Sequence, residues 1–279
     1  MRLRAAFWAG DGTTVVVGQG RTEFLEKYGQ VAGDLRDRGF AVAMVDWRGQ
    51  GLSDRALADR RIGHVGAYAE YQRDLDALLA GVAAAGLPPA TLLLAHSMGG
   101  AIGLRALGRG LFDRAVFSAP LWDLPRPPLV SWLLEPLLAA APRLRLGHRL
   151  LPGHGLEPVA LRDAYDGNDL TSDPDQYARF QTLLRAHPDL QLGGASLGWV
   201  AATLAEIRAL AAAPAPDTPI LTFLGGEERV VAPGAIRRHS ARQTGARLVE
   251  LDGARHETLM ETPQIRTRIW REIDAFCSA

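Results

Sequence analysis

The 279-residue sequence has a single cysteine, no net charge and no long run of apolar residues. Because Cys277 is the only thiol, the chain forms no internal disulfide and no cysteine metal site, which fits a reducing compartment. Acidic and basic residues balance at 31 each, so no nucleic-acid partner is indicated. No segment reaches the roughly 20 apolar residues that span a bilayer, and residues 1–8 lack a signal peptide's apolar core. We therefore expect a soluble, cytoplasmic protein.

Most of the chain alternates short apolar strands with amphipathic helices. The apolar spacing and the Gly and Pro boundaries predict this alternation. It is typical of an α/β fold whose mostly parallel central sheet carries helices on both faces. The expected strands are Leu3–Trp8, Thr13–Val17, Phe40–Val45, a run around Leu92–Leu94, Ala115–Phe117, Pro219–Leu224 and Leu248–Leu251. The expected helices are Phe24–Arg38, Tyr68–Ala85, Met98–Leu107, Trp199–Leu210, Ala235–Gln243 and Gln264–Phe276.

The alternation is interrupted between residues 121 and 196. This stretch is rich in proline, leucine and arginine, shows no clear strand, and has short helical patterns at Leu129–Leu138 and Asp175–Ala186. It is too long to be a plain loop inside a compact domain. We therefore expect an inserted helical cap at 121–196 and a core domain formed by 1–120 and 197–279.

Ser97 lies between the leucine-rich strand and the helix Met98–Leu107. A strand that turns into a helix within so few residues crowds its backbone, and small residues stand on either side, at Ala95 and Gly99. This is the pattern of a nucleophile elbow, in which a strained turn presents a serine hydroxyl at the sheet edge. The amide end of the helix favours a developing anion at that point.

A serine needs a general base and an orienting acid to act as a nucleophile at neutral pH. In open parallel sheets, functional residues gather at the carboxyl ends of strands. His256 follows the last predicted strand and Glu228 follows the strand before it, which gives the chain order serine, acid, histidine of this fold class. Two carboxylates compete with Glu228 for the histidine: its neighbour Glu227, and Asp123, which follows another strand.

Acyl transfer also needs N–H donors for the oxyanion. The amide of Met98, directly after the serine, is one expected donor, and the amide of Arg21, in the glycine-containing turn after the second strand, is the other. His96 is expected to point away from Ser97 and to contribute packing alone. We expect no metal and no organic cofactor.

Three motifs stand at the ends of predicted strands: Gly18–Tyr28 (GQGRTEFLEKY), Asp46–Ser53 (DWRGQGLS) and Ala95–Gly100 (AHSMGG). With the segments around the acid and the histidine, they resemble the α/β-hydrolase superfamily, and within it the lysophospholipase and monoacylglycerol-lipase-like branch of serine-aminopeptidase-like hydrolases. The resemblance weakens across the cap. In two of these motifs the sequence departs from the family, because Gln19 stands in place of a common histidine and Ala95 in place of a glycine.

The resemblance implies an α/β-hydrolase fold and a serine hydrolase that cleaves carboxylic esters through an acyl-serine intermediate. By it, Ser97, Glu228 and His256 fall on the catalytic triad, and Arg21 and Met98 on the oxyanion positions. The implied substrate is a lysophospholipid or a monoacylglycerol. A small-peptide aminopeptidase, a thioesterase or an acyltransferase could use the same triad. A non-catalytic protein that binds an apolar ligand is the alternative from another class.

The cap carries the question of substrate. Trp122 and Trp132, with Trp199 just beyond the cap, could line an acyl pocket or could simply pack the cap itself. Three arginines of the cap could meet a phosphate head group or an anionic membrane surface during transient contact, or could form a solvated face: Arg143, Arg145 and Arg149. The sequence predicts no oligomeric state.

Overall fold

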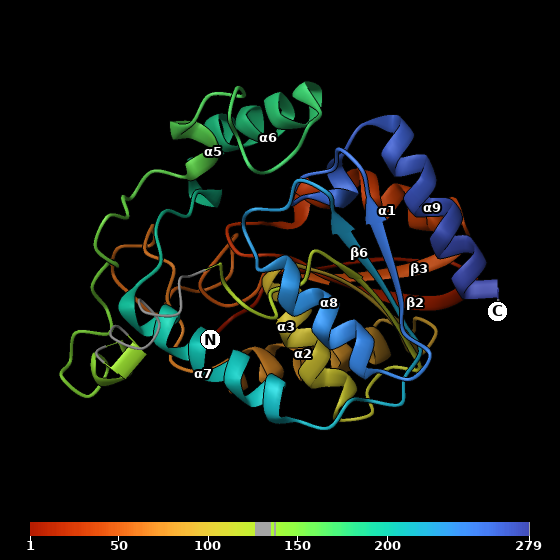
Figure 1. Cartoon of the computed structure of the whole chain (residues 1–279), viewed down its shortest axis with the longest axis horizontal. Helices are drawn as coiled ribbons and strands as arrows, with labels where there is room; N and C mark the ends of the chain where they lie inside the picture. Colours follow the sequence, from red (N-terminus) through yellow and green to blue (C-terminus); the bar gives the residue numbers. More distant parts are fainter. Residues whose placement is uncertain (126–134, 137, 279) are drawn as a thin grey trace.

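The computed structural model describes residues 1–125, 135–136 and 138–278, which form an α/β fold (Figure 1). In this part of the chain one sheet has seven strands in the order β1-β3-β2-β4-β5-β6-β7. β1 pairs antiparallel with β3, and all other neighbours are parallel, which confirms the predicted fold class. The strands are β1 (Ala5–Trp8), β2 (Gly12–Gly18), β3 (Phe40–Val45), β4 (Ala90–His96), β5 (Arg114–Ser118), β6 (Ile220–Gly225) and β7 (Arg247–Leu251).

The helices follow the predicted order. The long ones are α1 (Gly29–Arg36), α2 (Tyr68–Ala84), α3 (Met98–Leu107), α6 (Pro174–Ala186), α7 (Leu197–Ala212), α8 (Pro233–Arg242) and α9 (Pro263–Ser278). The short ones are α5 (Val159–Arg162) and the 3-10 turns η1 (Leu25–Tyr28), η2 (Pro188–Leu190) and η3 (Thr258–Met260). The predicted helix Phe24–Arg38 is divided into η1 and α1, and the predicted helix Leu129–Leu138 falls largely outside the described residues. No helix in the described ranges is both long and apolar enough to cross a bilayer.

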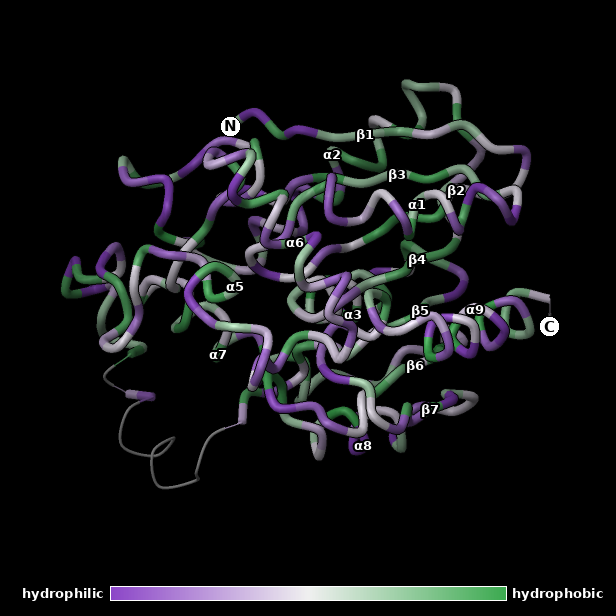
Figure 2. Tube along the Cα trace, turned by 90° about the horizontal axis from the view of Figure 1, so that it is seen from above, coloured by the Kyte–Doolittle hydropathy of each residue, from purple (hydrophilic) through white to green (hydrophobic). Residues whose placement is uncertain are grey.

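The central strands of the sheet are buried on both faces and largely apolar, whereas the edge strands β1 and β7 are partly exposed (Figure 2). Val16 packs into a core shared with α2, α3, α7 and α8, whereas its neighbours Val15 and Val17 pack into a second core shared with α1 and α9. This division follows from the two-residue alternation of side chains along a strand. Helices therefore cover both faces of the sheet, as the alternation of elements predicts.

The segment between β5 and α7 contains α5, α6 and η2, and its described residues add no strand to the sheet. Asp173 caps α6 by accepting hydrogen bonds from the amides of Asp175 and Gln176. Phe180 of α6 packs against Phe24, with ring centroids 6.0 Å apart. Figure 1 shows α5 and α6 apart from the helices that cover the sheet faces, on the side toward which β6 points.

Candidate active site

Ser97 occupies a strained turn between β4 and α3. Its φ of 50° and ψ of −118° lie outside the regions that residues with a side chain readily adopt. Such a conformation costs on the order of 1–3 kcal/mol and persists where its surroundings enforce it. The Ser97 amide donates to the carbonyl of Ser118 at 3.1 Å, and its carbonyl accepts the amide of Leu121 at 2.8 Å. The turn has the strand-to-helix geometry that the sequence predicts.

Missing side chains make room for this turn. A Cβ on Gly99 would overlap the carbonyl oxygen of Gly18, and a Cβ on Gly103 would lie 2.6 Å from a methyl group of Leu93. The methyl group of Ala95 fits because Gly18, its partner on β2, has no side chain, and a Cβ there would lie 3.3 Å from that methyl. The departure from glycine at position 95 is therefore accommodated by its neighbours.

His256 lies in the loop after β7 and joins Ser97 to Glu228. Its Nε2 is 2.9 Å from Ser97 Oγ, and its Nδ1 is 2.8 Å from Glu228 Oε2. Because a carboxylate accepts but does not donate, Nδ1–H donates to Glu228 and Nε2 accepts the hydrogen bond of the serine hydroxyl. Such a series lets the imidazole take the hydroxyl proton while the carboxylate stabilises the imidazolium. The structure thus brings together the three predicted residues from three separate loops.

Glu228 is held from both of its oxygens. Oε2 faces His256, and Oε1 accepts the amides of Val230 at 2.7 Å and Val231 at 3.0 Å. Burial acts to raise the pKa of Glu228, but the imidazole and these two amides outweigh burial and lower it. The carboxylate is therefore ionised at neutral pH and fixed in direction.

The two competing carboxylates make other contacts. Glu227 is half exposed and lies 3.5 Å from Arg255. Asp123 accepts the amide of Leu124 through its own side chain at 2.8 Å. The carboxylate that hydrogen-bonds to the imidazole is that of Glu228.

The turn after β2 lies against the start of α3, where Gly18 approaches Gly99. A Cβ on Gly20 would lie 3.1 Å from Cδ2 of His96, so this turn also passes close to the residue before Ser97. The Gly20 amide donates to the Glu23 carboxylate. Within residues 1–125, 135–136 and 138–278, the Arg21 amide has no acceptor, and Met98, as the first residue of α3, has none within its helix. Neither predicted oxyanion donor therefore has an acceptor among the described residues.

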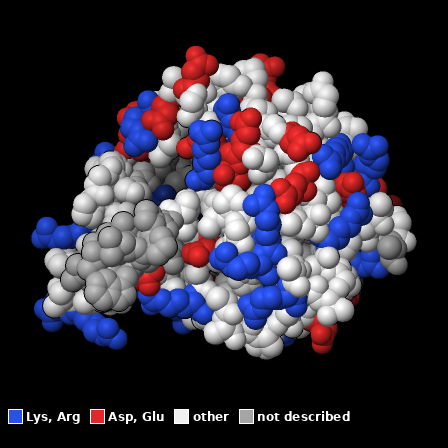
Figure 3. Space-filling model, viewed as in Figure 1, with Lys and Arg blue, Asp and Glu red and all other residues white. Residues whose placement is uncertain are grey.

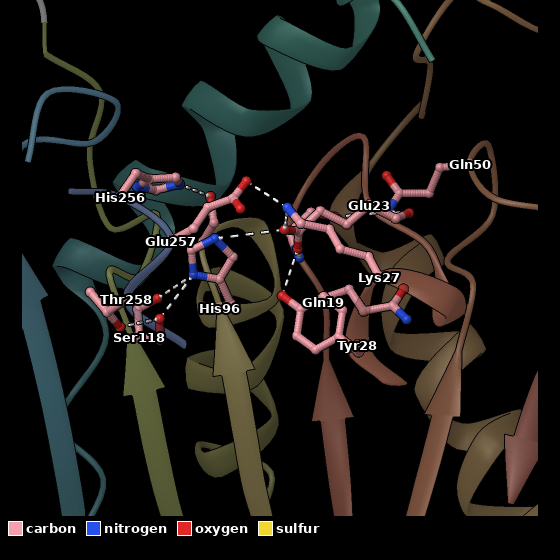
Figure 4. Close-up of polar contacts among 12 residues, drawn as sticks. Gln19, Glu23, Lys27, Tyr28, Gln50, His96, Ser118, His256, Glu257 and Thr258 are labelled. Carbon is pink, nitrogen blue, oxygen red and sulfur yellow. Dashed lines mark hydrogen bonds and ion pairs between the residues drawn. The ribbon is translucent and has the colours of Figure 1, made fainter. Parts of the chain in front are cut away.

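A buried ionic network that the sequence analysis did not predict lies beside the site (Figure 4). Lys27 Nζ donates to Glu23 at 2.6 Å and to Glu257 at 2.5 Å, and Tyr28 Oη donates to Glu23 at 2.7 Å. Lys27 and Tyr28 outweigh the effect of burial and lower the pKa of Glu23, whereas burial raises the pKa of Glu257 despite Lys27. Because Glu257 follows His256, the network ties the turn after β2 to the loop after β7.

His96 also belongs to the site, contrary to the expectation that it packs away from it. Its ring lies 4.7 Å from the His256 ring, and its Nδ1 lies 3.0 Å from the carbonyl oxygen of Ser118. That carbonyl can only accept, so Nδ1 carries the proton. Burial lowers the pKa of His96 to about 4, so the ring beside His256 is neutral at pH 7. The alternation of side chains along β4 could not predict this contact, because the strand ends at His96.

The three predicted substrate tryptophans have different positions. Trp122 is buried in the core against Phe117, and its Nε1–H donates to the carbonyl of Gly100, so we do not retain it as a pocket residue. Trp132 lies outside the described residues. Trp199, in the first turn of α7, faces the guanidinium of Arg21 at 5.1 Å. Arg21 and Trp199 therefore mark the junction of the core with the segment 121–196.

A serine, an imidazole and a carboxylate hydrogen-bonded in series at the edge of a parallel sheet are typical of α/β-hydrolases with a serine nucleophile. The fold and this geometry place the chain in that class. More narrowly, the chain belongs to the family described as serine aminopeptidase, S33, whose model matches residues 12–263.

Two curated relatives cover most of the chain. "Lysophospholipase L2" of Escherichia coli strain K12 is 34% identical over 266 residues, which cover 91% of this chain and 76% of that protein. "Probable lysophospholipase L2" of Haemophilus influenzae is 28% identical over 267 residues, which cover 94% of this chain and 82% of that protein.

Solved structures show the same fold at lower identity. The monoacylglycerol lipase of Paleococcus ferrophilus has a TM-score of 0.78 at 21% identity, with 100% of this chain and 99% of that chain covered. A soluble variant of the monoglyceride lipase of Saccharomyces cerevisiae has a TM-score of 0.74 at 17% identity, with 98% and 91% covered.

Proposed function

We propose that this protein is a serine ester hydrolase that cleaves lysophospholipids through an acyl-serine intermediate. The proposal rests on two consecutive hydrogen bonds. Ser97 Oγ lies 2.9 Å from His256 Nε2, and His256 Nδ1 lies 2.8 Å from Glu228. His256 removes the hydroxyl proton as Ser97 attacks the ester carbonyl, and returns a proton to the leaving alcohol. In the second half of the reaction, His256 activates the water that releases the fatty acid.

The amides of Arg21 and Met98 are the proposed donors to the oxyanion. Their lack of other acceptors and the close approach of Gly18 to Gly99 support this role. The partial positive charge at the start of α3 acts in the same direction. An amide of this kind typically contributes about 3 kcal/mol to transition-state stabilisation.

The substrate class is proposed from the relatives named lysophospholipase L2 and from the segment over the site. We propose that 121–196 is a cap on a core formed by 1–120 and 197–279. The loop that carries His256 is anchored to this segment, because the amides of His256 and Glu257 donate to the carbonyls of Asp169 and Leu170 at 3.3 and 2.7 Å. Figure 3 shows the surface hollowed next to this segment. A single acyl chain with a polar head is the class of ester that such a roofed site suits.

The description of the family as aminopeptidases gives a second candidate function. A free amino terminus requires an available carboxylate near the nucleophile. The buried carboxylates of Glu23 and Glu257 beside the site are both engaged by Lys27, which disfavours that function. A monoacylglycerol is the closer alternative, because it differs from a lysophospholipid in the head group alone.

Where the protein meets its substrate is also part of the proposal. We propose transient contact with lipid surfaces, since a single-chain lipid is presented in bilayers or micelles. Three arginines of the segment are exposed and available for such contact: Arg143, Arg145 and Arg149. The expected cytoplasmic location stays a prediction, which cell fractionation checks.

A substrate panel tests the proposed function. Purified protein is assayed with lysophosphatidylethanolamine, 1-monoacylglycerol, an acyl thioester and an aminoacyl anilide, with Ser97→Ala as the matched control. We expect fatty-acid release from lysophosphatidylethanolamine and none from the control. Turnover of the anilide without turnover of either lipid would replace the proposal with the aminopeptidase function. A wild type that hydrolyses none of them while binding the lipid would favour a non-catalytic binder.

A further inference from the structure

The side chain of Arg21 is partly buried at the junction of the core and the segment 121–196. Its guanidinium donates one hydrogen bond, from Nη2 to the carbonyl of Gly193 at 2.7 Å. Its central carbon lies 5.1 Å from the centroid of the Trp199 ring. A Cβ on Gly63 would overlap the guanidinium, so the absence of a side chain at Gly63 makes the space that it occupies. These contacts fix the position of the side chain, which does not extend freely into solvent.

The part of the chain that the structure describes provides no counter-ion for this partly buried charge. Among the described residues, no carboxylate forms an ion pair with Arg21 or stabilises its charged form, and the buried Nε has no hydrogen-bond partner. Burial lowers the pKa of Arg21 to about 10, so the group remains charged at neutral pH. Burying a cation without an anion is energetically unfavourable. Other partly buried arginines avoid this cost, as Arg48 does with Asp74 and Glu70.

The place of Arg21 in the chain makes a bound anion the natural partner. Its backbone amide is a proposed oxyanion donor, so its side chain starts at the reacting carbonyl and ends against Gly193 and Trp199. A lysophospholipid held with its ester carbonyl at Ser97 has its phosphate one glycerol backbone away, on the leaving-group side. A guanidinium binds phosphate through two parallel N–H donors.

We propose that the Arg21 guanidinium binds the phosphate of the lysophospholipid head group. This inference rests on the proposed function and assigns a residue to its specificity. Arg21 thereby contributes its amide to the carbonyl and its side chain to the phosphate of the same substrate. It distinguishes lysophospholipids from monoacylglycerols, which lack the phosphate.

The test compares two substrates that share one acyl chain, 1-palmitoyl-lysophosphatidylglycerol and 1-palmitoylglycerol, presented in the same neutral detergent micelles. The readout is the ratio of their kcat/KM values, because a general loss of activity cancels in it. Charged hydrogen bonds of this kind predict a fall in the ratio of at least about tenfold in Arg21→Gln. Arg21→Lys retains the positive charge but not the paired N–H donors of the guanidinium, so we expect an intermediate fall in the ratio. The matched control is Arg55→Gln, because Arg55 is another partly buried arginine with unpaired nitrogens but has the carboxylates of Asp46 and Asp189 nearby. Its ratio should stay within about twofold of the wild type.

Three outcomes overturn the inference, and only the third is also a failure of the proposed function. If Arg21→Gln and Arg21→Lys lower both kcat/KM values equally, Arg21 acts through structure alone. If inorganic phosphate inhibits hydrolysis of 1-palmitoylglycerol as strongly as glycerol 3-phosphate does, and Arg21→Gln abolishes both effects, the site is for free phosphate. If the wild type hydrolyses 1-palmitoylglycerol alone, the lysophospholipase function fails and the head-group site with it. Thermal unfolding of each variant, followed by circular dichroism, identifies any variant that does not fold. If Arg21→Gln does not fold, the ratio measured for Arg21→Lys tests the inference.

Discussion

At the scale of single residues, Glu228 is distinguished because both of its carboxylate oxygens accept hydrogen bonds. One accepts two backbone amides and the other accepts the imidazole, so the direction of His256 is set from the backbone of the loop after β6. Ser97, His256 and Glu228 could be proposed from the sequence, because each lies just past the end of a predicted strand. Small residues flank Ser97, and glycine marks the ends of the strands before Glu228 and His256. The residues alone leave Glu227 and Asp123 as competitors for the acid, and the family resemblance favours Glu228. Which carboxylate faces the imidazole depends on which loop turns it inward, and local sequence does not encode that.

Glu228→Gln should lower kcat/KM for a p-nitrophenyl ester by about 10³-fold or more, because the amide no longer stabilises the imidazolium. Asp123→Asn and Glu227→Gln should remain within about twofold of the wild type in the same assay. Near-normal activity of Glu228→Gln, with a large loss in Asp123→Asn, would assign the acid to Asp123.

The pKa of His96 predicts a loss of stability in mild acid. The ordinary histidine value is 6.5 and the folded value is about 4, so the unfolded chain takes up a proton as pH falls below 6.5 while the folded protein does not. The His96 contribution is complete above pH 6.5 and is lost between pH 6.5 and 4, by about 2 kcal/mol at pH 5. Urea unfolding at pH 7.5 and 5 should therefore show a smaller loss in His96→Asn than in the wild type. His148→Asn, at an exposed histidine, is the control and should lose as much stability as the wild type. Equal losses in the wild type and in His96→Asn would refute the prediction.

At the scale of elements, the elbow depends on how β2, β4 and α3 meet. The helix Met98–Leu107 and the strand Phe40–Val45 have the bounds that the sequence predicts, because apolar spacing and flanking glycine define them. The stretch 24–38 does not form one helix. In η1, Lys27 and Tyr28 turn toward Glu23, and apolar periodicity does not encode such a buried polar contact.

Two glycine substitutions in and after α3 should have opposite effects. Gly99→Ala places a methyl group against the Gly18 carbonyl and should cost about 1–3 kcal/mol of unfolding free energy, with reduced activity as the turn moves. Gly108→Ala, at a helical φ of −62° and with its nearest neighbour at 3.4 Å, should stabilise by about 0.4–1 kcal/mol. Chemical denaturation measures both, and equal effects would contradict the packing described for the elbow.

At the scale of the whole molecule, the site joins the two ends of the chain. Lys27 contacts Glu257 across 230 positions, and the segment 121–196 holds the same loop through Asp169 and Leu170. Local sequence patterns carry no information about such pairing, which explains why the network and the partial burial of Arg21 were not predicted. Glu23 directly precedes the predicted helix Phe24–Arg38 and stands four residues before Lys27, and this spacing was an available signal.

Lys27→Met should destabilise the protein by roughly 3–5 kcal/mol, because it leaves two buried carboxylates without a cation. The double variant Lys27→Met with Glu257→Gln should recover part of that loss, since one of those charges is then removed. Urea denaturation at pH 7.5 measures both. A double variant no more stable than Lys27→Met would show that the buried charges do not cause the loss.

The account depends most directly on the reactivity of one hydroxyl group. Intact-mass spectrometry of the protein treated with a fluorophosphonate measures it, with Ser97→Ala and His256→Gln treated in parallel. The account predicts a single adduct on the wild type, located on the peptide that contains Ser97, with none on Ser97→Ala and much slower labelling of His256→Gln. An unlabelled wild type, or equal labelling of Ser97→Ala, would contradict it.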